Sequence, residues 1–243
     1  MWALVASMAL TGAVLTSCSG GGASAPAGDP IFSEMTKVVD EYGPKGMTLI
    51  EGLKDAKTKD DVKAFQKEMA SLDSATNAAL DAALATMRDK EFPTEVAGDV
   101  PLKVVTPFKL NADESKNEKM ELVAVVENTA DTWNSDNPDG FRFSHLRVMF
   151  VDGNGKPVCA PDRERYEAKG EGDTKHKAGE KGEVTVKLKM ELWNAPLLSQ
   201  ACKVVITAVE DDNYKVARDT TAAAGRAFME RMRELQSGLR NVK

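Results

Sequence analysis

The spacing of apolar residues changes twice along this chain of 243 residues, and these changes restrict its fold more than any other feature. Before Pro93, apolar side chains recur every three or four residues, as on one face of a helix. Between Pro93 and about residue 212 they alternate with polar residues or form short runs, as in strands, and the tail returns to helical spacing. Consecutive strands without intervening helices predict an α+β fold with antiparallel sheets.

A helical hairpin is predicted over residues 30–93. Asp29-Pro30 is typical of a helix start, and Gly43-Pro44 is expected to interrupt that first helix. Thr58-Lys59-Asp60-Asp61 resembles a capping box and begins a second helix that is expected to reach about Glu91. Because the connection between the two helices is short, we expect them to pack antiparallel.

The strands are expected to form an antiparallel, immunoglobulin-like β-sandwich over residues 94–212. Asp152-Gly153 and Asn154-Gly155 predict a hairpin turn, and a change of parity near Ser144-His145 predicts a bulge. The segments with a strand pattern are 102–110, 120–127, 141–151, 183–191 and 203–209.

The C-terminal segment, residues 213–243, is predicted to form a helix that Asp219 or Thr220 caps. Its apolar face needs a partner, and we expect the helix to return and pack on the helical hairpin or on the sheet. That face consists of Ala224, Phe228, Met232, Leu235 and Leu239.

The N-terminal stretch has the length of a secretory signal peptide. Residues 2–17 are uncharged and mostly apolar, but they fall short of the ~20 residues of a permanent membrane span. Leu15-Thr16-Ser17-Cys18, which follows, resembles the lipobox of bacterial lipoproteins. The resemblance implies that residues 1–17 are removed and that Cys18 carries covalent diacylglycerol and an N-acyl chain. These acyl chains would make the lipid bilayer a partner of the chain.

Residues 18–29 are expected to form a flexible tether after the lipidated cysteine, since residues 19–28 consist of glycine, serine, alanine and one proline. By analogy with Gram-negative lipoprotein sorting, Ser19 favours the outer membrane of the cell envelope. No acidic cluster of the kind that accompanies surface export follows Cys18, which favours the periplasmic face over the cell surface.

The charge balance argues against a nucleic-acid partner, since the net charge is −6 and no long basic run occurs. Neither His145 nor His176 has a neighbour at zinc-ligand spacing, and no motif supports a nucleophile, so we assign no catalytic residue, metal or further cofactor. Past the lipobox, the body resembles in general texture the uncharacterised envelope lipoproteins that pair a helical hairpin with a β-sandwich.

We therefore expect a non-catalytic binding or scaffolding module that contacts an envelope protein or a glycan. Two alternatives stay open. One is a surface adhesin or glycan-capture module, and the other is a hydrolytic enzyme with a site built from dispersed carboxylates.

Cys159 and Cys202 are the remaining cysteines, and two alternatives stay open for them. Export to an oxidising compartment favours a disulfide bridge between them. Otherwise they are two buried small residues that do not meet.

The acidic loop 131–140 is the strongest remaining candidate for binding. Its oxygen-bearing residues Asp131, Asn134, Asp136 and Asp139 are a weak candidate for calcium, although asparagine, aspartate and glycine also simply form turns. Trp133 either contacts a sugar or a protein partner from the loop tip or folds back over the end of the sandwich.

Overall fold

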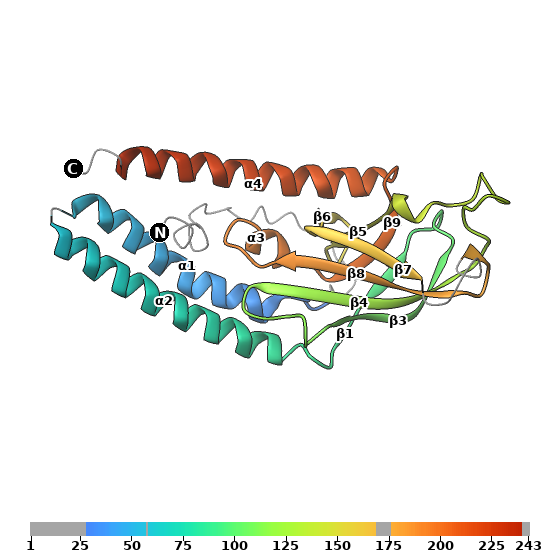
Figure 1. The fold of residues 1–243 in the computed structure, drawn as a ribbon, viewed down its shortest axis with the longest axis horizontal. Coiled ribbons are helices and arrows are strands. Elements are labelled where there is room, and N and C mark those ends of the chain that lie inside the picture. The colour runs from blue at the N-terminus through green and yellow to red at the C-terminus, as the bar shows by residue number, and fades with distance from the viewer. Residues whose placement is uncertain (1–27, 57, 169–175, 240–243) are drawn as a thin grey trace.

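Two β-sheets and three long helices make up the described part of the chain, residues 28–56, 58–168 and 176–239, in a computed structural model (Figure 1). The α+β prediction is confirmed, and the sheets are mostly antiparallel. The signal peptide, Cys18 and most of the predicted tether lie outside the described residues.

Two of the long helices lie at one end of the molecule, the third runs from beside the sheets to that same end, and the loops of the sheets lie at the other end (Figure 1). The helices are α1 (Ser33–Gly52), α2 (Lys59–Ala85), the short α3 (Ala195–Leu198) and α4 (Asp212–Leu239). The strands are β1 (Glu91–Phe92), β2 (Thr94–Val96), β3 (Leu102–Leu110), β4 (Lys119–Asn128), β5 (Leu146–Val151), β6 (Pro157–Cys159), β7 (Arg163–Ala168), β8 (Lys181–Lys189) and β9 (Lys203–Ala208).

The two sheets share one buried core. The larger has the strand order β1-β3-β4-β8-β7 and the smaller β2-β9-β5-β6, in which only β2 and β9 pair in parallel. Alternate residues of both sheets belong to the same buried cluster, which we call the main core, among them Leu122, Val126, Val184, Val148 and Ile206. The strand predicted over residues 183–191 is observed as β8, where Val184, Val186 and Leu188 are buried and alternate with less buried residues.

The smaller sheet is buried on both faces. Val148 and Phe150 of β5 point into the main core. Met149, between them, points to the opposite face and packs with Tyr214 and Ala217 of α4. The molecule is therefore layered as sheet, sheet and helix, which explains why β5 and β9 are apolar at consecutive positions.

The base of the helical hairpin closes one end of the main core. Phe32, just before α1, is fully buried and meets Phe150 edge-to-face with 5.3 Å between ring centroids. The prediction of a helix start at Asp29-Pro30 is wrong, because the Ile31 N–H donates to the carbonyl of Ala201 at 2.7 Å and α1 begins only at Ser33.

The hairpin differs from the prediction in α1 and agrees with it at the start of α2. The helix α1 runs through Pro44 without the predicted break, and the flanking Gly43 and Gly46 are buried. The predicted capping box is confirmed, since the Asp61 N–H donates to Thr58 Oγ1 and the Thr58 N–H donates to Asp61 Oδ2. The second helix ends at Ala85, before the expected end near residue 91.

The C-terminal helix begins seven residues before the predicted cap at Asp219. Asp211 is the cap, because its Oδ1 accepts the backbone N–H groups of Asn213 and Tyr214. The helix packs on the smaller sheet near Tyr214, and further along Phe228 and Met232 pack on the hairpin. The C-terminal helix thus packs on both the sheet and the hairpin, the two predicted partners. The second contact, which we call the tip cluster, consists of Met47, Ile50, Met69 and Met232 with Leu49, Phe65, Leu72 and Phe228.

The five segments predicted as strands correspond to β3, β4, β5, β8 and β9. The turn at Asp152–Lys156 joins β5 to β6 as predicted, with Gly155 at φ +80°. Residues 143–145 form a 3₁₀ turn instead of the predicted bulge. The strands β1, β2 and β7 were not predicted. Within the described ranges, no helix combines the length and the apolar composition that a membrane crossing requires.

The tip cluster predicts a large difference between two methionines of α4. Met232 is 7% exposed and Met229 is 52% exposed. We expect Met232→Ala to lower the free energy of unfolding by about 2–4 kcal/mol, because it leaves a cavity between α4 and the hairpin. The matched control Met229→Ala should change it by less than about 0.5 kcal/mol. Urea denaturation followed by circular dichroism measures both, and equal effects would contradict the packing of α4 on the hairpin.

Candidate functional site

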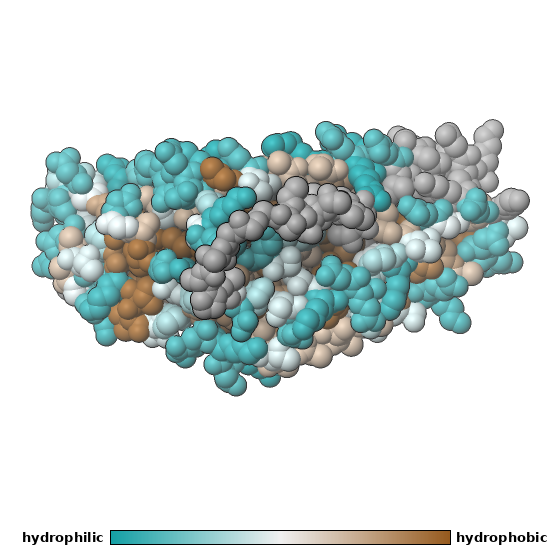
Figure 2. Space-filling view, turned by 180° about the vertical axis from the view of Figure 1, so that it is seen from behind, coloured by the Kyte–Doolittle hydropathy of each residue, from teal (hydrophilic) through white to brown (hydrophobic). Residues whose placement is uncertain are grey.

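The exposed large apolar side chains of the described residues are scattered along the chain, and two of them, Val216 and Met229, lie on α4; the full set is Val62, Val105, Trp133, Val216 and Met229. Seen from behind, the surface is mainly polar, with apolar areas near both ends of the long axis (Figure 2). The described surface therefore has no single large apolar patch that would mark a binding site. Two regions stand out, the loop around Trp133 and a cavity beside the helical hairpin.

Hydrogen bonds fix the backbone of residues 131–142, which we call the Trp133 loop. The Thr132 N–H donates to the carbonyl of His176 at 2.6 Å, and the Trp133 N–H donates to that of Phe141 at 2.9 Å. Within the loop, Asn134 Oδ1 accepts the N–H groups of Asp136 and Asn137, both at 2.8 Å. The loop is thus held to the sheet end and within itself.

Gly140 is required by this arrangement. A Cβ at this position would lie 2.5 Å from Asn137 Nδ2 and 2.6 Å from the backbone of Thr132 and Trp133. Asn137 Nδ2 is itself committed, because it donates to the carbonyl of Asp131 at 2.9 Å. Any side chain at residue 140 would therefore force the loop apart.

Trp133 points outward from this loop. It is 40% exposed, and the guanidinium of Arg142 lies over its ring at 4.7 Å from the centroid. The side chain is thus exposed, as a contact surface at the loop tip requires. The indole is thus a partly exposed aromatic surface on a backbone that its own hydrogen bonds hold in place.

Two of the four calcium candidates in this loop already accept backbone hydrogen bonds. Asp131 Oδ1 accepts the N–H of Ala178 at 2.9 Å, and Asn134 Oδ1 is engaged as described. Asp136 and Asp139 are exposed at the surface. In the part of the chain that the structure describes, no three histidine, cysteine, aspartate or glutamate residues are grouped so that they could hold a metal ion.

Cys159 and Cys202 are both buried and both free. Cys159 on β6 pairs with Phe150 of β5. Cys202 lies on the opposite edge of β5, where its N–H donates to the carbonyl of Val151. Two strand spacings amount to about 10 Å, whereas the Cα atoms of a disulfide lie within about 7 Å. Of the two alternatives, the bridge is therefore absent from this structure, and two buried residues that do not meet are observed.

Burial also makes these thiols unreactive. It raises the pKa of Cys159 to about 12, with a contribution from the nearby charge of Asp162, and it raises the pKa of Cys202. Since the thiolate is the reactive form, both cysteines are poor nucleophiles near neutral pH.

The structure places the two histidines differently and does not describe Cys18. His145 is about half exposed and its Nδ1 lies 3.1 Å from Glu210 Oε1. The Nδ1 of His176 is buried without a hydrogen-bond partner. Cys18 lies outside the described residues.

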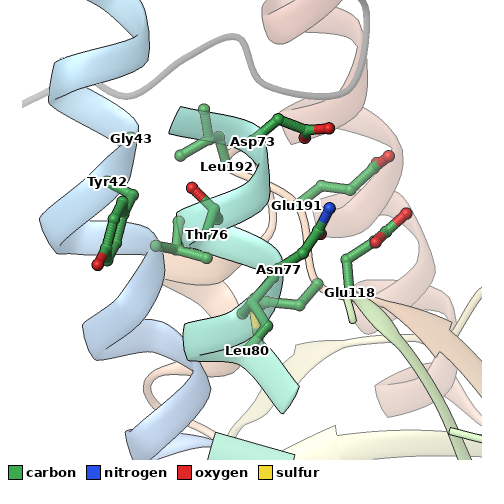
Figure 3. A pocket seen from close by; sticks show the side chains of 11 residues that line it. Tyr42, Gly43, Asp73, Thr76, Asn77, Leu80, Glu118, Glu191 and Leu192 are labelled. Atoms are coloured by element: carbon green, nitrogen blue, oxygen red, sulfur yellow. The ribbon is translucent and has the colours of Figure 1, made fainter. Parts of the chain in front are cut away.

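A cavity of about 60 Å³, which we call the hairpin cavity, lies beside the helical hairpin and was not predicted (Figure 3). It occurs where the main core ends along α1 and α2 and before the tip cluster begins. Its apolar walls are Val39, Leu80, Met190 and Leu192, and its other lining residues are Tyr42, Gly43, Asp73, Thr76, Asn77, Glu118 and Glu191.

The polar lining of the hairpin cavity is gathered on one side. Figure 3 shows Asp73, Asn77, Glu118 and Glu191 on one flank, and Tyr42 on the other. These residues come from four segments far apart in the sequence, so no local pattern could have brought them together. In the sequence, Asp73 and Asn77 are two polar residues of a helix, and Glu118 and Glu191 lie next to strand ends, so none of them stands out as a site residue.

Hydrogen bonds hold the two glutamate positions. Asn117, with φ +55°, donates its N–H to Asp81 Oδ1 of α2 at 2.7 Å, which brings Glu118 beside that helix. The Glu191 N–H donates to Asn194 Oδ1 at 2.8 Å, and the side chain of Glu191 accepts from the indole N–H of Trp193.

Lys189 partly neutralises these glutamates. Its Nζ lies 2.9 Å from Glu191 Oε1 and 3.5 Å from Glu118 Oε1. Burial alone would lower the pKa of Lys189, but the hydrogen bond and charge of Glu191, together with the charge of Glu118, outweigh it and raise that pKa. With Asp73 included, the cavity carries two negative charges in excess.

Comparison with known proteins gave no match to a protein-family model, to a curated protein or to a solved structure. The function is therefore argued from the residues and their geometry alone.

The free cysteines lead to a testable prediction. In a Cys18→Ser chain purified from the envelope without reductant, denaturation should expose two thiols per chain to Ellman's reagent. In the folded chain the same reaction should be slower by at least about tenfold, because both sulfurs are buried and have raised pKa values. Cys159→Ser and Cys202→Ser should each remove one thiol. A denatured chain without reactive thiols, 2 Da lighter than its reduced form, would reveal a bridge.

Proposed function

We propose that this chain is a lipid-anchored protein of the bacterial cell envelope that acts as a non-catalytic binding or scaffolding module. The observation that carries the proposal is Trp133, exposed on a loop whose backbone is held by hydrogen bonds. A large aromatic side chain on a fixed backbone loses little conformational entropy on binding, which is why such residues dominate many interfaces. Leu15-Thr16-Ser17-Cys18 supports the lipid anchor.

The proposal includes an immunoglobulin-like relationship for the two-sheet part. Two sheets with a common core support it, and so does the switch of the chain from the larger sheet at β1 to the smaller one at β2 with only Pro93 between them. Loops at one end of such a sandwich are frequent binding surfaces, and the Trp133 loop lies at the end remote from the helices (Figure 1).

A second candidate, a glycan-capture module or adhesin, is favoured by one specific observation. The ring of Trp133 and the guanidinium of Arg142 are stacked and both residues are exposed. Indole faces pack against the C–H faces of sugar rings, and an adjacent guanidinium can donate hydrogen bonds to hydroxyl groups.

The anchor is tested by the mass and labelling of the mature protein. We expect residues 1–17 to be removed and palmitate to be incorporated in cells. Cys18→Ala should abolish labelling, because it removes the thiol that is acylated, whereas the matched control Cys159→Ala should keep it. Labelled Cys18→Ala protein would contradict the anchor.

Protease treatment of the same cells then locates the body. The proposal expects protection in intact cells and digestion after the outer membrane is opened, with a periplasmic marker as control. Digestion of intact cells with the marker untouched would favour the adhesin alternative.

The contact surface is tested with a photo-crosslinking residue. We expect crosslinks from Ser135, in the Trp133 loop, but not from the control position Ser74, which is exposed on α2. Trp133→Ala should reduce the yield at least about tenfold, because truncating a central aromatic contact commonly costs that much affinity. Equal yields from both positions would contradict a role for the loop.

The glycan alternative has its own readout. In a Trp193→Phe chain, soluble peptidoglycan fragments should quench the emission of Trp133 if the ligand is a sugar. Crosslinks to protein without such quenching would favour a protein partner.

A further inference from the structure

The hairpin cavity combines hydrocarbon walls with an excess of negative charge. Val39, Leu80, Met190 and Leu192 form its apolar side, and these four residues belong to the main core. Asp73, Glu118 and Glu191 lie at its polar side together with Asn77 (Figure 3). A ligand that matches both sides needs a cationic group and a hydrocarbon part in one molecule.

From this combination we propose that the hairpin cavity binds a primary ammonium group at the end of a short unbranched alkyl chain. Such a group occurs in a free alkylamine and in the side chain of a lysine. The ammonium group would lie among Asp73, Asn77 and Glu118, and the methylene groups would pack on the apolar walls.

The volume of the cavity limits the size of the ligand. A volume of about 60 Å³ holds about four to six water-sized groups. Four methylene carbons and one nitrogen are five groups of this size, so an n-butylammonium ion fits the cavity.

The charges favour a primary ammonium over a neutral ligand. Lys189 neutralises part of Glu191 and Glu118 from the sheet side. Asp73 lies on α2, and within the described residues its side chain makes no hydrogen bond or ion pair. An ammonium group has three donors for carboxylate and amide oxygens, so it can pair with Asp73 and Glu118 and still donate to Asn77.

The site is held in place before any ligand arrives. The N–H of Asn117 binds Asp81, and the N–H of Glu191 binds Asn194, so the backbones that carry both glutamates are fixed to their surroundings. The indole of Trp193 donates to Glu191, and this contact places a fluorescent reporter at the edge of the cavity. A fixed site costs little reorganisation on binding.

The test uses the full mature lipoprotein in detergent, with Trp133→Phe so that the emission of Trp193 reports alone. We expect n-butylammonium chloride to change this emission saturably, with a dissociation constant on the order of 1 mM, as suits so small a ligand. n-Butanol at the same concentrations should bind at least about tenfold more weakly, and tetramethylammonium chloride controls for ionic strength.

Charge and shape are then varied separately. Asp73→Asn and Glu118→Gln should each weaken n-butylammonium binding about tenfold, because each removes a charge-assisted hydrogen bond. Glu68→Gln, on the exposed face of α2, is the matched control and should change nothing. Thr76→Leu should block the cavity without altering its charge, and an unchanged thermal unfolding curve would show that this variant is folded.

A peptide with a single lysine distinguishes the two sources of the ammonium group. Tighter binding of the peptide than of n-butylammonium indicates a lysine of a partner, and the reverse indicates a free amine. Both results support the proposal. It is overturned if n-butylammonium and n-butanol give equal responses, or if Asp73→Asn and Glu118→Gln bind as the parent does. Because the Trp133 loop is not involved, failure here leaves the proposed function untouched.

Discussion

The contact between Phe32 and Phe150 is the interaction on which the rest of the architecture depends. Phe150 lies in the central part of the smaller sheet, and Phe32 begins the helical hairpin, so this edge-to-face pair joins two parts of the chain that differ in secondary structure. Both rings are fully buried. Without this junction the hairpin would have no fixed direction relative to the sheets, and the cavity between its helices and the strand ends would not exist.

The C-terminal helix extends this junction along the length of the molecule. Near its start, Tyr214 and Ala217 cover the outer face of the smaller sheet, and near its end Phe228 and Met232 cover the tip of the hairpin. One helix thus buries two separate apolar surfaces. Between these contacts Gly225 faces the ring of Trp193, and a Cβ there would meet that ring at an ordinary contact distance of 3.9 Å.

The elements that were predicted from the sequence are those with strong local patterns. The capping box at Thr58 and the alternation of β8 depend on neighbouring residues, and the structure contains both. The prediction failed where distant contacts decide the outcome. Pro44 does not interrupt α1, whose neighbouring glycines are buried, and Asp211 starts α4 although an acidic run before a helix looks like a solvated loop.

The same distinction applies to the sites. Trp133 was identified because an aromatic residue among asparagine, aspartate and glycine is conspicuous in the sequence. Its exposure could not be predicted, since it depends on Arg142, on Gly140 and on a bond to the carbonyl of His176. An oxidising compartment made a bridge between Cys159 and Cys202 one of two open alternatives, and the strand order, which places β5 between them, decides against it.

The hairpin cavity lies beyond sequence analysis for a physical reason. The main core ends along α1 near Val39 and the tip cluster begins at Met47, so the hairpin has one stretch that neither apolar cluster fills. Polar residues from α2 and from two strand ends converge on that stretch, which leaves charge next to hydrocarbon. A gap between two cores arises only from the assembled fold. Because the main core and the tip cluster supply the packing on either side of the cavity, the residues that line it are free to bind a ligand.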